Sequence, residues 1–255
     1  MNPPAEVRLR LTLIIPAWND GDELSRLIPA VVRLKELDEV IVVDASPSLT
    51  SSEIVRAAGG IYLQADVPSR GLQMNLGAGR AAGDVLIFHH ADSRLTDQHL
   101  NAIRTALRNP GVLGGAFYRK FDDRHPHLLP LEKLARFITR HGGSFFGDQS
   151  IFVRRDTFRA LDGFASLPLM EDLEFSRRLR RAGRVAVLDP PIRSSSRRHL
   201  ERGAWRTTFE NAALICLYRF GCSPAILHRW YYRPRTLLPN ESSFSTQSLE
   251  ELGGS

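Results

Sequence analysis

Asp-Val-Leu-Ile-Phe-His-His-Ala-Asp-Ser-Arg, residues 84–94, is the stretch that decides the fold. Its apolar run predicts a buried strand, which delivers one carboxylate, Asp92, to its carboxyl end. Residues 40–44 (Val-Ile-Val-Val-Asp) form a second apolar run that ends in Asp44, and residues 11–18 form a third that ends at a proline turn. Ligands of open α/β sheets sit at the carboxyl ends of the strands. Three buried strands with polar ends at one edge are typical of a nucleotide-binding crevice.

The composition is that of one enzyme-sized globular unit. The 255 residues are 43% hydrophobic and 24% charged, which suits an α/β domain with a full core. The two cysteines, Cys216 and Cys222, lack metal-ligand spacing and fit a reducing cytoplasm. The first apolar run is too short for a secretory signal, and no run approaches a membrane span. We therefore expect a cytoplasmic protein that is soluble or peripheral to a membrane.

The formal net charge of +6 is unevenly spread along the chain. Residues 237–255 hold three acids, no bases and many serines and glycines, so we expect a disordered tail. Between Arg177 and Arg206 there are ten arginines against two acids. Part of this segment could be a solvated helix face, but such a density indicates an anionic partner. A diphosphate, an acidic membrane surface and nucleic acid are the three candidates.

Strand and helix patterns alternate in the first half of the chain. Strands are predicted at 11–16, 39–44, 61–65 and 84–89, and helices at 22–37, 51–58, 72–82 and 97–109. This order predicts a parallel sheet with right-handed crossovers. In the second half, strands are predicted at 112–121, 150–154 and 185–189, and helices at 130–140, 155–161, 171–182, 203–220 and 224–232. The expected fold class is α/β, with a mixed central sheet flanked by helices.

Five short motifs follow one another along these elements. They are Ile-Ile-Pro-Ala-Trp-Asn (14–19), Val-Val-Asp-Ala-Ser (42–46), Arg-Gly-Leu-Gln-Met-Asn-Leu-Gly-Ala (70–78), His-Ala-Asp-Ser (90–93) and Met-Glu-Asp-Leu-Glu-Phe (170–175). Over residues 9–235 the chain resembles the family 2 glycosyltransferases of the GT-A fold. It is most similar to a bacterial subgroup that resembles the diaponeurosporenoate (carotenoid) glycosyltransferases. The resemblance implies a Rossmann-like GT-A domain at 9–200, a C-terminal helical extension packed on it at 201–235, and the disordered tail at 236–255.

The resemblance implies that the strand ends hold the base of a nucleotide-sugar. Pro16, Ala17 and Asp44 match the residues around the base, and Asp44 would accept hydrogen bonds from uracil and ribose. The alternative for Asp44 is to cap the helix that follows it. Gln73 and Asn75 are expected to brace the neighbouring loop rather than to touch the ligand.

Three arginines are implied to contact the donor phosphates. Arg70 resembles an arginine that lies over the base and phosphates, although a solvated loop arginine is an equally weighted alternative. Arg197 and Arg198 fall in the segment that closes over the donor in the family, where guanidinium groups grip phosphate.

Asp92 matches the last acid of the family's metal-binding Asp-x-Asp motif, and the first acid is replaced by His90 in this chain. A divalent cation, Mg²⁺ or Mn²⁺, would bridge the two phosphates and neutralise charge on the leaving group. Asp92 can hold either ion, whereas a nitrogen ligand at His90 would favour a softer ion than Mg²⁺. His89 is expected to pack against a neighbour in the sheet rather than to bind metal.

The resemblance makes Asp172 the catalytic base. An inverting transfer needs one carboxylate that takes the proton from the acceptor hydroxyl as its oxygen attacks the anomeric carbon. We expect the dipole at the start of helix 171–182 to lower the pKa of Asp172 and keep it ionised. Glu171 and Asp148 are placed on the acceptor side. Ordinary helix stabilisation is the alternative for the paired acids, and a turn role is the alternative for Asp148.

These expectations combine into one predicted activity. The chain is expected to be an inverting glycosyltransferase that uses a UDP-sugar and a hydroxyl or carboxyl acceptor, and the subgroup resemblance suggests an isoprenoid or carotenoid lipid. The alternatives are nucleotidyl transfer, a non-catalytic nucleotide binder and a basic nucleic-acid-binding protein. Nucleotidyl transfer would need a glycine- and arginine-rich N-terminal loop, which this chain lacks. Nucleic-acid binding would need a recognition motif, which is also missing from the sequence. We therefore expect no nucleic-acid partner.

The C-terminal helices have the composition of a membrane-surface segment. Arginines lie beside aromatic residues there: Arg219, Arg229, Arg233 and Arg235 with Trp230, Tyr231 and Tyr232. Aromatic rings sit at the depth of lipid head groups, and arginines bind anionic lipids. A peripheral position on the inner face of the cell membrane is the resulting expectation.

Overall fold

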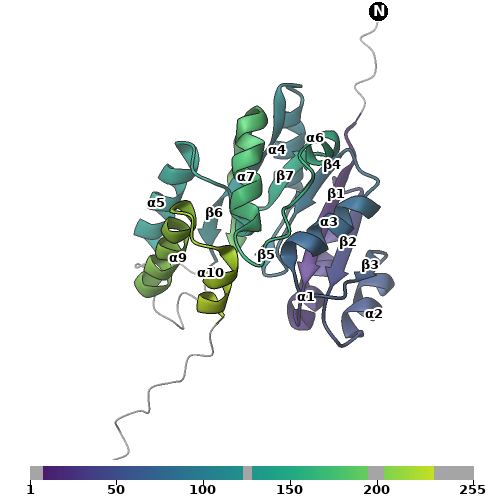
Figure 1. Ribbon diagram of the computed structural model, residues 1–255. Coiled ribbons are helices and arrows are strands. Elements are labelled where there is room, and N and C mark those ends of the chain that lie inside the picture. The colour runs from purple at the N-terminus through teal and green to yellow at the C-terminus, as the bar shows by residue number, and fades with distance from the viewer. Residues whose placement is uncertain (1–7, 123–127, 195–203, 233–255) are drawn as a thin grey trace, which may run out of the picture.

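The structure is a computed structural model that describes residues 8–122, 128–194 and 204–232, and its centre is one eight-stranded sheet (Figure 1). The first half of the chain alternates strands and helices, as predicted. Its elements are β1 (Leu11–Ala17), α1 (Gly21–Val31), β2 (Glu39–Asp44), α2 (Thr50–Ala57), β3 (Ile61–Gln64), α3 (Arg70–Arg80), β4 (Val85–Phe88), β5 (Ser93–Arg94) and α4 (Asp97–Leu107).

The second half completes the sheet and adds the remaining helices. Its elements are β6 (Val112–Phe121), α5 (Leu129–Arg140), the 3-10 turn η1 (Gly147–Gln149), β7 (Ile151–Arg154), α6 (Arg155–Ala160), α7 (Glu171–Ala182), β8 (Arg184–Ser194), α9 (Ala204–Arg219) and α10 (Pro224–Tyr231). The strand order is β3-β2-β1-β4-β7-β6-β8-β5. β1 to β4 are parallel, β7 is antiparallel to both of its neighbours, and β6 is parallel to β8. The predicted α/β fold with a mixed sheet is confirmed.

Helices cover both faces of the sheet because the side chains of each strand alternate between two cores. On β1, Leu13 and Ile15 pack with residues of α1, α2 and α4, whereas Ile14 packs with residues of α3, α6 and α7. α3 lies very close to the sheet at Gly77, where a Cβ atom would come within 2.5 Å of the Ile14 side chain. The first turn of α3 lies beside the carboxyl ends of β1 and β2, because Gln73 in this turn donates hydrogen bonds to the carbonyls of Ala17 and Val43.

Two element boundaries differ from the sequence-based predictions by five residues or more. α1 ends at Val31 instead of 37 because the chain must already be back at the sheet at Asp38. There, the Leu11 N–H donates to Asp38 Oδ2 at 2.8 Å, and the Asp38 N–H donates to the Leu11 carbonyl at 3.1 Å. β8 continues to Ser194 instead of 189 because it pairs with β6 as far as Phe121, in spite of two prolines that a register shift accommodates.

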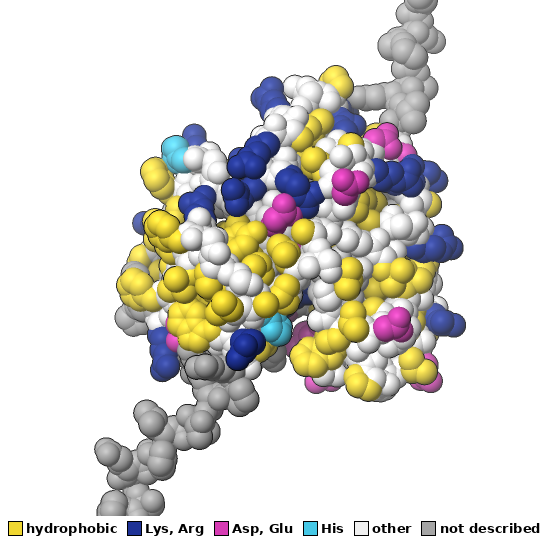
Figure 2. All heavy atoms as spheres, viewed as in Figure 1, with side chains coloured by type: hydrophobic (Ala, Val, Ile, Leu, Met, Phe, Trp, Pro, Cys, Tyr) yellow, Lys and Arg dark blue, Asp and Glu magenta, His cyan; other side chains and the backbone are white. Residues whose placement is uncertain are grey.

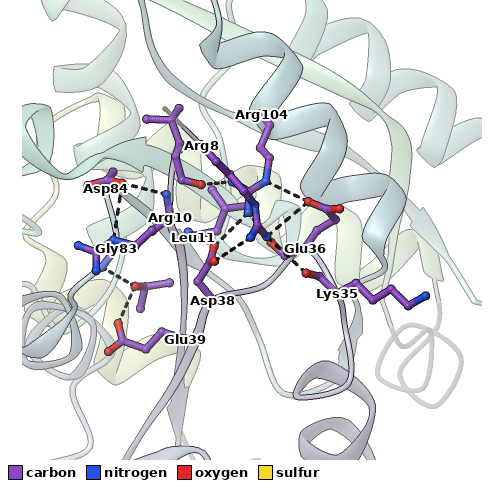
Figure 3. A network of polar contacts seen from close by, with 12 residues as sticks. Arg8, Arg10, Leu11, Lys35, Glu36, Asp38, Glu39, Gly83, Asp84 and Arg104 are labelled. Atoms are coloured by element: carbon purple, nitrogen blue, oxygen red, sulfur yellow. Dashed lines mark hydrogen bonds and ion pairs between the residues drawn. The ribbon is translucent and has the colours of Figure 1, made fainter. Parts of the chain in front are cut away.

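A polar network fixes the amino edge of the sheet, opposite the predicted site (Figure 3). Thr12 is fully buried; its hydroxyl donates to Glu39 at 2.6 Å and accepts from the Gly83 N–H at 3.0 Å. Nearby, the Arg104 guanidinium donates to Asp38 Oδ2 at 3.0 Å. These bonds join β1, α4 and the starts of β2 and β4. The polar groups of Thr12 and Asp38 at the amino edge are thus bonded to other groups of the protein itself.

Candidate active site

The carboxyl ends of β1 and β2 lie side by side and form one wall of the site. Pro16 and Ala17, the last residues of β1, are in register with Val43 and Asp44 at the end of β2. Gln73 of α3 ties the two ends together, because its Nε2 donates to the Ala17 carbonyl at 2.7 Å and to the Val43 carbonyl at 2.8 Å. Gln73 thus has the bracing role that the sequence predicted.

Asp44 is fully buried, and its Oδ2 has no hydrogen-bond partner among the described residues. The other oxygen, Oδ1, accepts hydrogen bonds from the backbone N–H of Ser46, at 2.8 Å, and from the Ser46 hydroxyl. Asp44 does not cap the following helix, because α2 begins at Thr50 with Leu49 at its N-cap. A buried acceptor that lacks a donor destabilises the folded protein, and a ligand that supplies the donor removes this penalty. Oδ2 of Asp44 is therefore placed to accept a hydrogen bond from a ligand.

Arg70 is the first residue of α3 and not a loop residue, because this helix begins two positions earlier than predicted. Desolvation alone would lower the pKa of Arg70, but Tyr232, Glu171 and Asp172 raise it above its ordinary value. The guanidinium therefore lies within electrostatic reach of the acidic start of α7 and of the residue that follows α10. A cation in this position can balance the charge of a bound phosphate.

Asp20, directly after β1, is a charged residue of the site that the sequence argument missed. It accepts a hydrogen bond from the Trp18 N–H at 2.9 Å. Desolvation raises the pKa of Asp20, the charge of Asp92 raises it further, and Arg70 lowers it. These three charges therefore lie near one another at the carboxyl edge. Its position in the sequence could have identified it, because Asp20 follows a buried strand just as Asp92 does.

Asp92 is exposed on the loop after β4, and its Oδ1 accepts a hydrogen bond from the Ser93 hydroxyl at 3.3 Å. The ring of His90 lies against Gly147, where a Cβ atom would be 2.3 Å from Nε2. Within the described ranges, no group of three or more His, Cys, Asp or Glu side chains is arranged to bind a metal ion. A single carboxylate still fits Mg²⁺ or Mn²⁺, because such ions take much of their coordination from substrate phosphates and water.

Glu171 and Asp172 begin α7, directly after Met170, whose φ is 70°. Asp172 accepts hydrogen bonds from the backbone N–H groups of Gly147, at 2.8 Å, and Leu173, at 2.6 Å. Desolvation nevertheless raises the pKa of Asp172, so the prediction that the helix dipole lowers it is wrong. Desolvation and then the charge of Asp172 raise the pKa of Glu171 to about 7. This pair of carboxylates can exchange a proton closer to neutral pH than ordinary carboxylates do.

Asp148 lies close to Asp172 and is held by a residue that the sequence argument missed. The Arg119 guanidinium, on β6, donates to Asp148 Oδ2 at 2.7 Å. The charge of Asp148 contributes to the raised pKa of Asp172. No local motif could have identified Arg119, because only the folding of β6 beside η1 brings it to this loop.

The C-terminal helices border this site. Tyr231, the last residue of α10, and Tyr232 both contribute to the raised pKa of Arg70. Arg197 and Arg198 lie outside the described residues, so their contact with phosphate stays a prediction. Among the helices in the described ranges, none combines the length and the apolar character that crossing a bilayer requires.

A comparison of the sequence with models of protein families gives a match that includes these strand ends. The model of glycosyl transferase family 2 matches residues 12–163, which is more than half of the chain. The chain belongs to glycosyl transferase family 2. The match runs from β1 through α6 and includes Asp44 and Asp92, but it ends before Asp172. Family membership confirms the predicted glycosyltransferase class, and the carotenoid subgroup stays a prediction.

Solved glycosyltransferases share the GT-A fold of this family 2 chain at low sequence identity. The mannosyltransferase PcManGT from Pyrobaculum calidifontis, in complex with GDP-Man and Mn²⁺, is 19% identical, with a TM-score of 0.63 over 88% of this chain and 70% of its own. S. aureus TarS is 16% identical, with a TM-score of 0.59 over 73% of this chain and 37% of its own. The chain thus spans well under half the length of TarS. No curated protein matches the sequence.

Proposed function

We propose that the chain transfers a sugar, with inversion, from a UDP-sugar to a hydroxyl or carboxyl of its acceptor. Membership of glycosyl transferase family 2 supports sugar transfer. TarS has been solved with UDP-GlcNAc and PcManGT with GDP-Man, so this fold accommodates nucleotide-sugars. The observation that carries the proposal is the buried Oδ2 of Asp44, which lacks a donor among the described residues. The N–H of a uracil ring is a donor of the required kind, and Pro16 and Ala17 would flank the same base.

Asp172 is the proposed base. It takes the proton from the acceptor oxygen while that oxygen bonds to the anomeric carbon and the nucleoside diphosphate leaves from the opposite face. A raised pKa suits this role, because a stronger base accepts the proton more readily while remaining ionised above its pKa. Both carboxylate oxygens keep lone pairs beyond the two backbone hydrogen bonds, so the acceptor can still donate to them. Glu171 and Asp148 would border the acceptor.

Cationic groups are proposed to act on the leaving diphosphate. A divalent cation that enters with the donor would be held by Asp92 and would neutralise charge as the glycosidic bond breaks. Arg70 would contact the same phosphates, and we assign this role also to Arg197 and Arg198. We do not place His90 among the metal ligands, because its ring is packed against Gly147.

Product analysis tests the reaction. The full-length protein is incubated with a panel of UDP- and GDP-sugars, Mn²⁺ and a membrane lipid extract, and the anomeric configuration of the product is determined by NMR. Asp172→Asn keeps the shape of the side chain but cannot take the proton, so transfer should fall about 10²–10⁴-fold while UDP affinity holds. Asp156→Asn, on the exposed surface of α6, is the matched control and should keep full transfer. A product that retains the donor configuration would refute the single displacement.

A non-catalytic nucleotide binder is the second candidate, and the replacement of the first motif acid by His90 favours it. This candidate predicts UDP binding by calorimetry without turnover of any donor in the panel. Binding to DNA in preference to UDP would instead point to the nucleic-acid alternative.

We propose that the acceptor is a lipid, of the isoprenoid or carotenoid kind, at an anionic membrane surface. Figure 2 shows hydrophobic side chains gathered over α9 and α10, at the end of the molecule that also carries α5. Phe220, which follows α9, is 90% exposed. We call the exposed set the apolar ledge: Leu134, Phe137, Ile138, Phe209, Leu217, Phe220, Ile226, Trp230 and Tyr232.

The charge around the apolar ledge supports a lipid surface as its occupant. α5, α9 and α10 together carry six lysines and arginines and two glutamates. Exposed rings flanked by cations are the features with which peripheral helices bind anionic head groups. Tyr231 and Tyr232, at the end of α10, raise the pKa of Arg70, and so does Asp172. A lipid chain on the apolar ledge would therefore present its head group near Asp172. The proposed extension at 201–235 would then serve a cytoplasmic GT-A domain as its membrane contact.

A further inference from the structure

His89, the residue after β4, is completely buried between two loops of the site. Its Nε2 lies 3.1 Å from the carbonyl of Ser93, and its Nδ1 lies 2.7 Å from the Ser150 hydroxyl. A carbonyl only accepts, so Nε2 carries the proton and donates to it, and Nδ1 then accepts from Ser150. The neutral imidazole has both of its nitrogens satisfied in this arrangement.

The two partners of His89 belong to loops that carry different parts of the site. Residues 89–93, which we call the donor loop, end with Ser93, whose hydroxyl donates to Asp92 at 3.3 Å. Residues 147–150, which we call the acceptor turn, contain Asp148 and end with Ser150. The backbone of Ser150 has a φ of 51°, which residues other than glycine adopt at a cost. A strained turn needs fixed partners, and His89 supplies one of them.

The neighbouring residue makes a second contact between the same loops. The ring of His90 lies so close to Gly147 that a Cβ atom there would be 2.3 Å from Nε2 and 2.8 Å from Cε1. Gly147 in turn donates its N–H to Asp172 Oδ2 at 2.8 Å. A continuous set of contacts therefore runs from Asp92 through the donor loop and the acceptor turn to Asp172.

We propose that His89 is a positioning residue that fixes the acceptor turn against the donor loop, and so sets the place of Asp172 relative to Asp92. This inference rests on the proposed function, because it assigns these two carboxylates to the two reactants. His89 itself touches neither reactant, since it is buried beneath both loops. Misplacing reacting groups by about 1 Å costs on the order of 10²-fold in rate. Loss of His89 should therefore reduce kcat more than it reduces the affinity for the donor.

The experiment compares two buried histidines. His89→Phe keeps the ring volume and removes both hydrogen bonds, and Ser150→Ala removes only the bond to the acceptor turn. His89→Gln can restore the N–H that donates to Ser93. The matched control is His99→Phe, because His99 is 5% exposed and its hydrogen-bond partners, Thr96 and Pro191, belong to neither loop. Measurements are kcat and KM with the donor that the wild type turns over, UDP affinity by calorimetry, and thermal stability.

We expect the substitutions at His89 and Ser150 to lower kcat while the affinity for UDP stays nearly the same. At a temperature where every variant is folded, His89→Phe should lose about 10²-fold in kcat, Ser150→Ala should lose less, and His89→Gln should recover part of the loss. UDP affinity should stay within about twofold in all of them, and His99→Phe should keep its kcat. Wild-type kcat in both His89→Phe and Ser150→Ala would overturn the proposal. If His89→Phe does not fold, Ser150→Ala and His89→Gln carry the test.

An activity-independent measurement separates failure of this inference from failure of the proposed function. If the wild type turns over no donor, the proposed function fails, and amide hydrogen exchange then tests the contact itself. His89→Phe should speed exchange in residues 89–93 and 147–150, and His99→Phe should not. Unchanged exchange in both loops of His89→Phe would overturn the assignment of His89.

Discussion

Asp44 shows how far a single residue supports the proposed donor site. We predict that Asp44→Asn weakens UDP binding by about 1–3 kcal/mol, because an amide N–H would face the base donor in place of an acceptor. The bonds to Ser46 can be kept by the amide oxygen, so the melting temperature should change little. Isothermal calorimetry with UDP measures the effect, and Asp66→Asn, an exposed aspartate, is the control. Equal affinities in all three proteins would remove Asp44 from the base site.

Glu171 allows a test of stability against pH. Its pKa is raised from 4.5 to about 7, so between these values the native state binds more protons than the unfolded state. The contribution of this group to the free energy of unfolding therefore falls as pH rises from about 4.5 to 7. Glu171→Gln removes that loss, and we predict a variant that is more stable than the wild type by about 1–3 kcal/mol at pH 8.

The same advantage of Glu171→Gln should be much smaller at pH 5, where the native carboxyl is mostly protonated in the wild type. Urea denaturation of both proteins at the two pH values measures the difference. Glu174→Gln is the control, because Glu174 lies on the same helix and is paired with Arg178 at 2.6 Å. An advantage of Glu171→Gln that is equal at both pH values, or larger at pH 5, would contradict the burial of this carboxyl.

The site residues that sequence could predict share one property, which is their place at the end of a strand or the start of a helix. Asp44 and Asp92 were predicted in this way, because the carboxyl ends of parallel strands must meet at one edge. Asp172, at a helix start, received its predicted role from the resemblance of residues 170–175 to the family motif. Arg119 and Ser150 could not be identified, because each acts through a loop that is remote in sequence. Their roles depend on which strands pair, and the sequence carries no local signal for that pairing.

The elements themselves were largely predictable, and the errors have a common physical cause. The apolar runs located β1, β2 and β4, since a strand covered on both faces needs a continuous run of buried side chains. The ends of α1 and β8 were wrong because a neighbouring strand, and not local sequence, sets them. β5, with two residues, exists only through its pairing with β8 and has no pattern of its own. Local propensity thus decides the kind of element, while sheet pairing decides its length.

The two edges of the sheet should respond differently to mutation. Thr12→Val keeps the side-chain shape but leaves the Gly83 N–H and one Glu39 interaction without their partner. We predict a loss of about 1–3 kcal/mol in the free energy of unfolding, with unchanged UDP affinity, because Thr12 lies at the amino edge. Denaturant titration and calorimetry measure the two quantities. Asp44→Asn is the reciprocal variant, and parallel effects of both substitutions on stability and affinity would contradict the division of the sheet.

At the scale of the whole molecule, charge and apolar surface are arranged around one end of the fold. α5, α9 and α10 carry the apolar ledge and most of their charge is positive, while the end of α10 reaches Arg70 in the site (Figures 1 and 2). A large patch of exposed apolar side chains that is bordered by polar residues is typical of a surface that contacts a protein or a membrane. The arrangement therefore joins two requirements of the proposed function, which are a contact for the lipid and a carboxylate for its hydroxyl.

The apolar ledge yields the most demanding prediction. The wild type should sediment with vesicles of phosphatidylglycerol and phosphatidylcholine at low salt, and less so at high salt, because exposed charges are screened within about 10 Å at 0.1 M. Phe220→Ser combined with Ile226→Ser should weaken vesicle binding at least about tenfold, since each buried side chain contributes about 1.5–3 kcal/mol. Leu49→Ser, which is 62% exposed beside α2, is the control and should bind as the wild type does. UDP affinity should be equal in all of these proteins. A wild type that stays in the supernatant at low salt would make a soluble acceptor the better proposal, because the ledge would then have no lipid to contact.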